Sequence, residues 1–258
     1  MRSKSYLLKI FLLMACYGFL TSGCRKLYDY IQTHGDGDYK ACNIKKLQVL
    51  YYPPFAGAKT DTFNFQFTYN ALGNPVSVIN DHVGTGNGNF FFKYDKYNRL
   101  REFTSLYTNG YETWHRYGCN DKGQVVRDTM HIFGALVNGA PVPSDFYYYF
   151  DFAYDSKNRI STETVASYIR ENLSFIDKKV YTYDAKGNLV TNGVNVYDDK
   201  LSIYRTNSIW MFILRDYSVN NRFIATKYNE FGLPLVFNSK LNLIGGPGTD
   251  TRVEYFCH

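Results

Sequence analysis

The sequence has little excess charge, and its N-terminal apolar run is short. It carries 29 Lys and Arg against 23 Asp and Glu, a net charge of +6 over 258 residues. So small an excess gives no concentrated basic face, and nucleic acid is therefore excluded as an expected partner. The apolar run Ile10–Leu20 has eleven residues, whereas a membrane-spanning helix needs about 20. This run is too short to cross a bilayer as a helix.

Side chains with the spacing of metal ligands or catalytic groups are also missing. None of the five histidines forms an HxxxH or HxH pair, and no Cys-x-x-Cys is present. Gly84–Asn89 is rich in glycine, but it lacks the Lys-Ser/Thr ending and the following helix of a phosphate-binding loop. Asp36 and Asp38 lack the glutamate of a calcium-binding loop. We therefore predict no metal, no cofactor and no enzymatic activity.

The N-terminus has the order of an export signal. Three basic residues precede the apolar run 10–20, which ends in Thr21-Ser22-Gly23-Cys24. This ending resembles the lipobox read by the lipoprotein signal peptidase, although Leu20 lies one place earlier than usual. The resemblance implies that residues 1–23 are removed and that Cys24 is multiply acylated, since one acyl chain anchors a protein only weakly. An ordinary cleaved secretory signal is the alternative.

The mature chain divides into a tether and one domain. Removing the signal lowers the Lys plus Arg count from 29 to 26 and the net charge from +6 to +3. Residues 24–40 include the polar, Gly-rich stretch 34–38 and show no hydrophobic period, so we predict a lipidated tether. Residues 41–258 are enough for one sizeable core, and we predict a single β domain and a monomer.

A repeat is the most informative feature of that domain. Six predicted strands each run into a turn with Asp or Asn at its first position and Gly or Asn at its fourth. Five of these strands end in tyrosine and one ends in Cys119. Asp or Asn at the first position bonds nearby backbone amides, and Gly or Asn at the fourth tolerates a left-handed backbone. Because Asn replaces Asp freely, acid chemistry by these aspartates is excluded. The first and fourth positions are Asn70 and Gly73, Asp95 and Asn98, Asn120 and Gly123, Asp155 and Asn158, Asp184 and Gly187, and Asn229 and Gly232.

The chain on both sides of these turns alternates between apolar and polar residues. Residues 62–69 illustrate this period of two, which is typical of strands. We therefore predict an all-β fold, a curled antiparallel meander of about 13 to 16 strands built from β-hairpin repeats. The dense apolar run at 205–216 is either a buried strand or a short helix, and we favour a helix that covers one end of the sheet. Its Trp210 is expected in the core.

The recurrent Tyr-Asp-x-x-Gly/Asn-x-Leu resembles the YD repeat of RHS and teneurin-type proteins. With the lipobox, the tether and the late stretch Ser218–Asn221, the chain resembles the short YD-repeat lipoproteins of unknown function from Gram-negative bacteria. This resemblance covers residues 42–258 and implies a curled antiparallel sheet with the tyrosines stacked on one face. It implies no reaction.

The cysteines predict one disulfide. Export places the domain where disulfides persist, and three cysteines, Cys42, Cys119 and Cys257, remain after the lipidated Cys24. They allow one bond and one free thiol. Because Cys42 opens the first predicted strand and Cys257 closes the last, we favour that pair, with Cys119 in the core in place of a tyrosine.

Two function classes remain. The first is a non-catalytic structural or interaction module on the outer membrane that binds an envelope protein or a polymer through an exposed sheet face. The second is a carbohydrate-binding lipoprotein that uses exposed Tyr or Trp. Packed tyrosines would favour the first, and an exposed row of aromatic rings would favour the second. Arg25-Lys26-Leu27 lacks the acidic run associated with surface export, which favours the periplasmic side of the membrane.

Overall fold

The computed structural model describes residues 42–51, 60–190, 196–238 and 250–257. The predicted signal 1–23, the tether 24–40 and the lipidation site Cys24 lie outside these ranges. Within them the chain forms strands, one short α-helix and one 3₁₀ helix. The elements in chain order are β1 (Cys42–Tyr51), β2 (Asp61–Tyr69), β3 (Pro75–Asn80), β4 (Asn89–Tyr94), β5 (Leu100–Tyr107), β6 (Gly110–Cys119), β7 (Val125–Val137), β8 (Ala140–Pro141), β9 (Phe146–Tyr154), β10 (Ile160–Ile169), β11 (Asn172–Val180), β12 (Thr182–Tyr183), β13 (Leu189–Val190), η1 (Ile203–Thr206), α2 (Ser208–Leu214), β14 (Ala225–Tyr228), β15 (Pro234–Phe237) and β16 (Asp250–Cys257).

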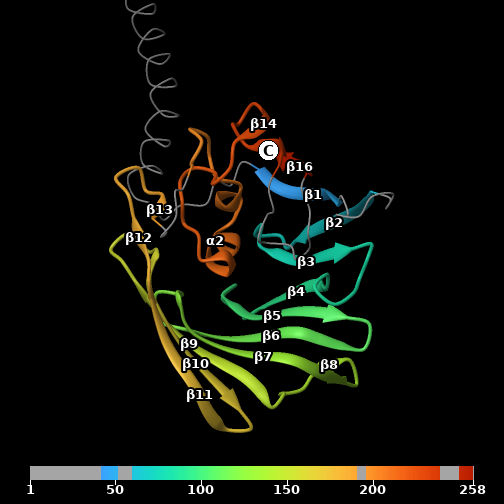
Figure 1. Cartoon of the computed structure of the whole chain (residues 1–258), viewed down its shortest axis with the longest axis vertical. Helices are drawn as coiled ribbons and strands as arrows, with labels where there is room; N and C mark the ends of the chain where they lie inside the picture. Colours follow the sequence, from blue (N-terminus) through green and yellow to red (C-terminus); the bar gives the residue numbers. More distant parts are fainter. Residues whose placement is uncertain (1–41, 52–59, 191–195, 239–249, 258) are drawn as a thin grey trace, which may run out of the picture.

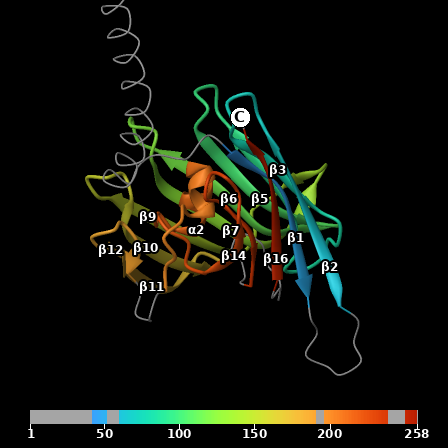
Figure 2. The same cartoon turned by 90° about the horizontal axis from the view of Figure 1, so that it is seen from above.

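One antiparallel sheet of 14 strands dominates the fold, and β12 and β13 form a separate two-stranded sheet. The order along the large sheet is β11-β10-β9-β7-β6-β5-β4-β3-β2-β1-β16-β15-β14, with β8 paired to β7. Figures 1 and 2 show that this sheet curls strongly around α2. The predicted curled antiparallel meander is therefore confirmed, including the strand number and the single short helix.

The order departs from a simple meander at one place. β1 pairs with β2 on one side and with the C-terminal β16 on the other. After β11 the chain leaves that edge of the sheet and forms η1 and α2 inside the curl of the sheet. It then adds β14, β15 and β16, which pair with one another and join the sheet beside β1. The first and last strands thus lie side by side within the sheet.

The hydrophobic core lies between the concave face of the sheet and α2. Because side chains alternate along a strand, every second residue faces the hollow. The Trp210 ring of α2 is fully buried and contacts Phe67 and Phe92 edge-on, at centroid distances of 5.6 and 5.5 Å. Phe212 makes the same kind of contact with Tyr117 at 5.3 Å and with Phe152 at 5.6 Å. Trp210 is thus a core residue.

The run at 205–216 becomes a helix because both ends are capped. The Asn207 side chain accepts a hydrogen bond from the Ile209 amide at 3.0 Å, as an N-cap residue does. At the other end Arg215 adopts a left-handed conformation with φ of 55°, which stops the helix. Asn207 also donates to the Gly73 carbonyl at 2.8 Å, so the helix is tied to the first repeat turn. Within the described ranges, no helix is long and apolar enough to cross a membrane.

Candidate functional site

The six repeat turns share one hydrogen-bond pattern. In each, the Oδ1 of the first residue accepts from the backbone amides two and four residues later, at 2.8 to 3.0 Å. The fourth residue has φ between 56° and 84° in all six. Both carboxylate and amide side chains provide this oxygen, which explains why Asp and Asn interchange. These turn residues therefore have a structural role.

The repeat tyrosines link successive turns along one end of the sheet. The Tyr94 hydroxyl donates to the carbonyl of Pro75, two residues past the preceding turn, at 2.7 Å. Tyr154 donates in the same way to Val125 at 2.8 Å, and Tyr183 donates to Ile160 at 3.3 Å. Burial raises the pKa of these hydroxyls above the ordinary value, so they remain donors at neutral pH. The tyrosines form a packed ladder.

A further copy of this link, outside the six predicted repeats, was missed in the sequence. Tyr197 donates to the carbonyl of Leu189, two residues past the fifth turn, at 2.6 Å. Asp198, which follows it, accepts from the Lys200 amide at 2.9 Å, as the first residue of a repeat turn does. The Tyr-Asp pair was the available signal, but no Gly or Asn follows at the fourth position.

Cys119 breaks the ladder. Its thiol lies 3.7 Å from the Leu100 carbonyl oxygen, the atom that a tyrosine hydroxyl would reach directly in this repeat. A cavity of about 470 Å³ opens beside Leu100. Three repeat turns, strands of the concave face and α2 enclose it; its walls include Asn98, Leu100, Lys122, Val125, Tyr154, Asn158, Met211 and Phe212. This cavity is the best-formed candidate for a small-ligand site.

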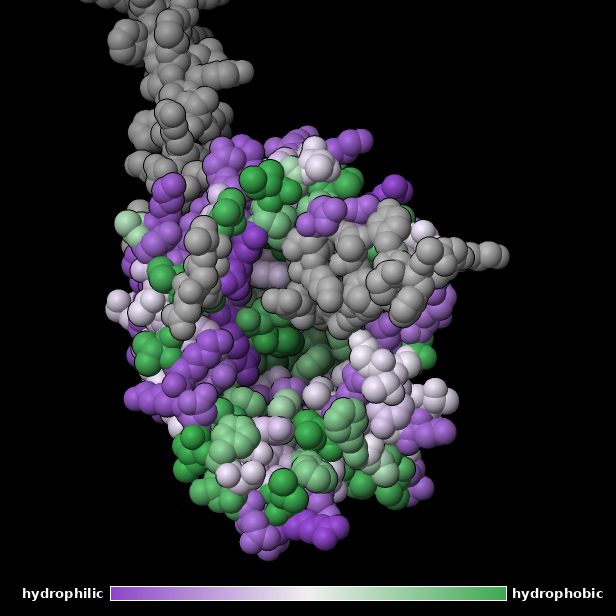
Figure 3. Space-filling model, in the orientation of Figure 1, coloured by the Kyte–Doolittle hydropathy of each residue, from purple (hydrophilic) through white to green (hydrophobic). Residues whose placement is uncertain are grey.

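A second candidate is the β11 end of the sheet. Every residue of β11 is exposed. The β11 edge surface comprises five exposed apolar side chains, which are Ile169, Leu173, Phe175, Ile176 and Val180, at 41, 51, 46, 64 and 64% of their full exposure. Figure 3 shows apolar side chains gathered over the lower strands of the molecule, where β9–β11 lie. Phe175 and Leu173 pair with the consecutive β10 residues Ser167 and Tyr168, so these apolar side chains lie on both faces of the edge strand. Apolar surface gathered along one strand is a candidate interaction site.

Buried charged groups lie beneath the C-terminal end of α2. Asp128 is fully buried, and its Oδ2 lies 2.8 Å from His115 Nδ1. Arg215 donates to Glu163 at 2.8 Å while its guanidinium stacks on Phe152 and Phe212, 4.4 and 4.5 Å from the ring centroids. The cluster fastens α2 to the sheet. No group of three or more His, Cys, Asp or Glu side chains among the described residues could hold a metal ion.

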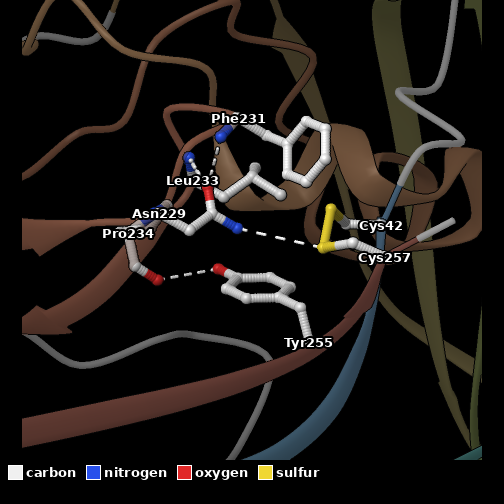
Figure 4. Close-up of a disulfide and its surroundings, with 7 residues drawn as sticks. All are labelled: Cys42, Asn229, Phe231, Leu233, Pro234, Tyr255 and Cys257. Atoms are coloured by element: carbon white, nitrogen blue, oxygen red, sulfur yellow. Dashed lines mark hydrogen bonds between the residues drawn. A yellow bond between two sulfur atoms is a disulfide. The ribbon is translucent and has the colours of Figure 1, made fainter.

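The structure joins Cys42 to Cys257 by a disulfide with an S–S distance of 2.09 Å (Figure 4). The two residues are register partners in β1 and β16. Nearby, Tyr255 donates to the Pro234 carbonyl at 2.8 Å, which continues the tyrosine links, and Asn229 of the last turn lies 4.0 Å from Cys257 Sγ. Cys119 is the free cysteine among the described residues.

No known protein family matches the sequence, and no curated protein matches it. Among solved structures, a porin-like protein from Bacteroides uniformis ATCC 8492 is similar over 83% of this chain and 98% of its own, with 11% identical residues and a TM-score of 0.39. A similarity at that level carries no argument about function. The function is therefore inferred from the contacts of the chain's own residues.

Proposed function

We propose that this chain is a non-catalytic interaction module, held at the outer membrane by lipid on Cys24, that binds an envelope protein along β11. The observation that carries the proposal is the β11 edge surface, exposed apolar side chains on a strand that pairs on one side only within the described residues. Partner strands add to such edges because unpaired amide and carbonyl groups are available there.

The backbone of β11 presents these groups outward. The Tyr181 amide donates to the Ser161 carbonyl of the β10 side at 2.9 Å. Because consecutive residues of an antiparallel strand point their backbone groups to opposite sides, Ile176, Lys178 and Val180 direct theirs away from β10. The Lys178 amide donates to the Asp177 carboxylate at 2.8 Å, so the outward amides of Ile176 and Val180 are the ones offered to a partner. An extended segment of a partner therefore meets a row of donors and acceptors flanked by apolar side chains.

Charge distinguishes the kind of partner. Lys178 forms no ion pair within the part of the chain that the structure describes, and lysine on an edge strand opposes pairing between identical copies. A partner segment with acidic residues compensates this charge, whereas a second copy of β11 adds to it. We therefore propose a different protein as the occupant, with an acidic extended segment.

Sugar binding on exposed Tyr or Trp has less support. The indole rings of Trp114 and Trp210 are buried. On the convex face Tyr147 and Tyr168 stack on each other, with centroids 5.2 Å apart and an angle of 5°. These ring faces contact protein, so they offer no open platform to a saccharide.

The test is a photo-crosslinking amino acid at position 176 of the full chain in cells. Position 224 is the matched control, because Ile224 is 67% exposed against 64% for Ile176 but lies beside β14 at the opposite edge. We expect one discrete adduct with a different protein at 176 and none at 224. Val180→Pro, which removes an outward amide, abolishes the adduct, and Val180→Thr, which keeps the amide and the side-chain shape, retains it. A homodimer adduct, equal adducts at both positions or an adduct unaffected by the proline substitution would contradict the proposal.

Fractionation of the same cells tests the lipid anchor. The Cys24→Ala protein should be found in the soluble fraction and not with the membrane.

A further inference from the structure

The cavity lies beside Leu100, whose carbonyl lacks the tyrosine partner that other repeats provide. On the neighbouring tyrosine strands, β4 and β9, Tyr94 and Tyr154 fill the space against the preceding turn and reach its carbonyl at 2.7 and 2.8 Å. β6 ends in Cys119, which leaves the Leu100 carbonyl with a thiol contact at 3.7 Å. The cavity of about 470 Å³ is lined by Leu100 but not by Cys119, so it adjoins the residue whose carbonyl the missing hydroxyl would reach.

The walls of the cavity separate into an apolar floor and a polar rim. The floor consists of the buried Leu100, Val125, Met211 and Phe212, with the half-buried Tyr154 beside them. The volume falls within the range of about 300 to 1,000 Å³ that is usual for small-molecule sites. A ligand that fits this floor has one apolar face.

The rim presents hydrogen-bond donors. The Oδ1 of Asn98 already accepts from Asn70 at 3.1 Å, and the Oδ1 of Asn158 accepts from Gln124 at 2.8 Å. Their Nδ2 groups remain as donors with no partner among the described residues. Lys122 forms no ion pair there either, and no Asp or Glu lines the cavity. The rim therefore selects a ligand that is rich in acceptors and negatively charged.

We propose that this cavity binds one unit of an acidic saccharide. A pyranose ring has an apolar face of C–H groups that packs on the floor, and its edge carries hydroxyl groups that accept from Asn98 and Asn158. One sugar hydroxyl donates to the Leu100 carbonyl and thereby replaces the tyrosine hydroxyl of the other repeats. The sugar carboxylate pairs with Lys122. This site is separate from β11 and does not depend on the protein partner proposed there.

The test is calorimetric titration of the full chain with trigalacturonate and with neutral galactotriose. We expect saturable binding of the acidic probe and at least about tenfold weaker binding of the neutral one, because the charged hydrogen bond to Lys122 is lost. Lys122→Ala should weaken the binding of trigalacturonate by a similar factor. Lys157→Ala is the matched control, since Lys157 occupies the same position of the next turn outside the cavity walls.

The decisive experiment brings a tyrosine hydroxyl to the Leu100 carbonyl in the wall of the cavity. Cys119→Tyr should restore the ladder, raise the melting temperature and abolish binding, whereas Cys119→Ser should bind as the wild type does. If Cys119→Tyr is folded and binds normally, the cavity is not the site. Absence of binding by the wild type, or equal binding of both probes, also overturns the proposal. Crosslinking at position 176 should be unchanged in Cys119→Tyr, so failure here is distinguishable from failure of the β11 proposal.

Discussion

At the scale of single residues, the repeat depends on one side-chain oxygen. In the fifth turn, the Oδ1 of Asp184 accepts from the Lys186 and Asn188 amides at 2.9 and 2.8 Å. This bonding is local, so the sequence alone was sufficient to predict where each turn begins and why Asp and Asn interchange. The loss of this oxygen also sets how much a substitution of Asp184 should lower the free energy of unfolding.

Asp184→Ala should lower the free energy of unfolding by about 1 to 2 kcal/mol, because two backbone amides lose their acceptor. Asp184→Asn keeps the oxygen and should change that free energy by less than about 0.5 kcal/mol. Urea unfolding followed by tyrosine fluorescence measures both. An equal loss in the two variants would show that the carboxylate charge, and not the shared oxygen, stabilises the turn.

At the scale of elements, α2 is the part that the sequence left open. An apolar run of this length fits either a buried strand or a short helix, and its capping by Asn207 and Arg215 settles the difference. The Cys42–Cys257 disulfide was predicted, but the hydrogen-bonded pairing of β1 with β16 and the exposure of β11 were not, because both depend on contacts between distant segments. Predicting the cavity beside Leu100 would also have required the position of α2, since the helix forms one of its walls.

Asn207→Ala should lower the free energy of unfolding by about 2 kcal/mol, because it removes both the cap on Ile209 and the bond to the Gly73 carbonyl. Asn207→Asp retains the capping oxygen and loses only the donor, so we expect roughly half of that loss. Thermal unfolding of the two variants beside the wild type gives the comparison. If aspartate is as destabilising as alanine, the tie to the first turn outweighs the cap.

At the scale of the whole molecule, the tyrosine links and the disulfide hold the curled sheet in different ways. The disulfide joins β1 to β16, which are already paired, and acts by restricting the unfolded chain, with a typical contribution of about 2 to 4 kcal/mol. Where they are present, the tyrosine links instead connect a hairpin to the one before it along the end of the sheet, and they require protonated hydroxyls. Their contribution therefore depends on pH.

This dependence gives the last prediction. The Tyr69 hydroxyl donates to the Ile44 carbonyl at 2.7 Å and so belongs to the ladder. Burial raises the pKa of four ladder tyrosines, Tyr69, Tyr94, Tyr154 and Tyr183, above the ordinary value of 10.0. Below pH 10 both states are protonated and the full stability is present. As the pH rises above 10, the unfolded chain releases protons that the folded chain retains, so stability falls by at most about 1.4 kcal/mol per pH unit for each such tyrosine.

The free energy of urea unfolding measured between pH 9 and pH 11 should therefore be nearly level at first and then fall steeply. Above pH 10, the free energy of unfolding of Tyr94→Phe should fall less steeply with pH than that of the wild type, by at most about 1.4 kcal/mol per pH unit, the contribution of one tyrosine. Tyr97→Phe, at a ring that is 67% exposed, should leave the slope close to that of the wild type. A slope that is the same in all three proteins would mean that the Tyr94 hydroxyl ionises as readily in the folded chain as in the unfolded one, and the ladder would then have no part in the pH dependence.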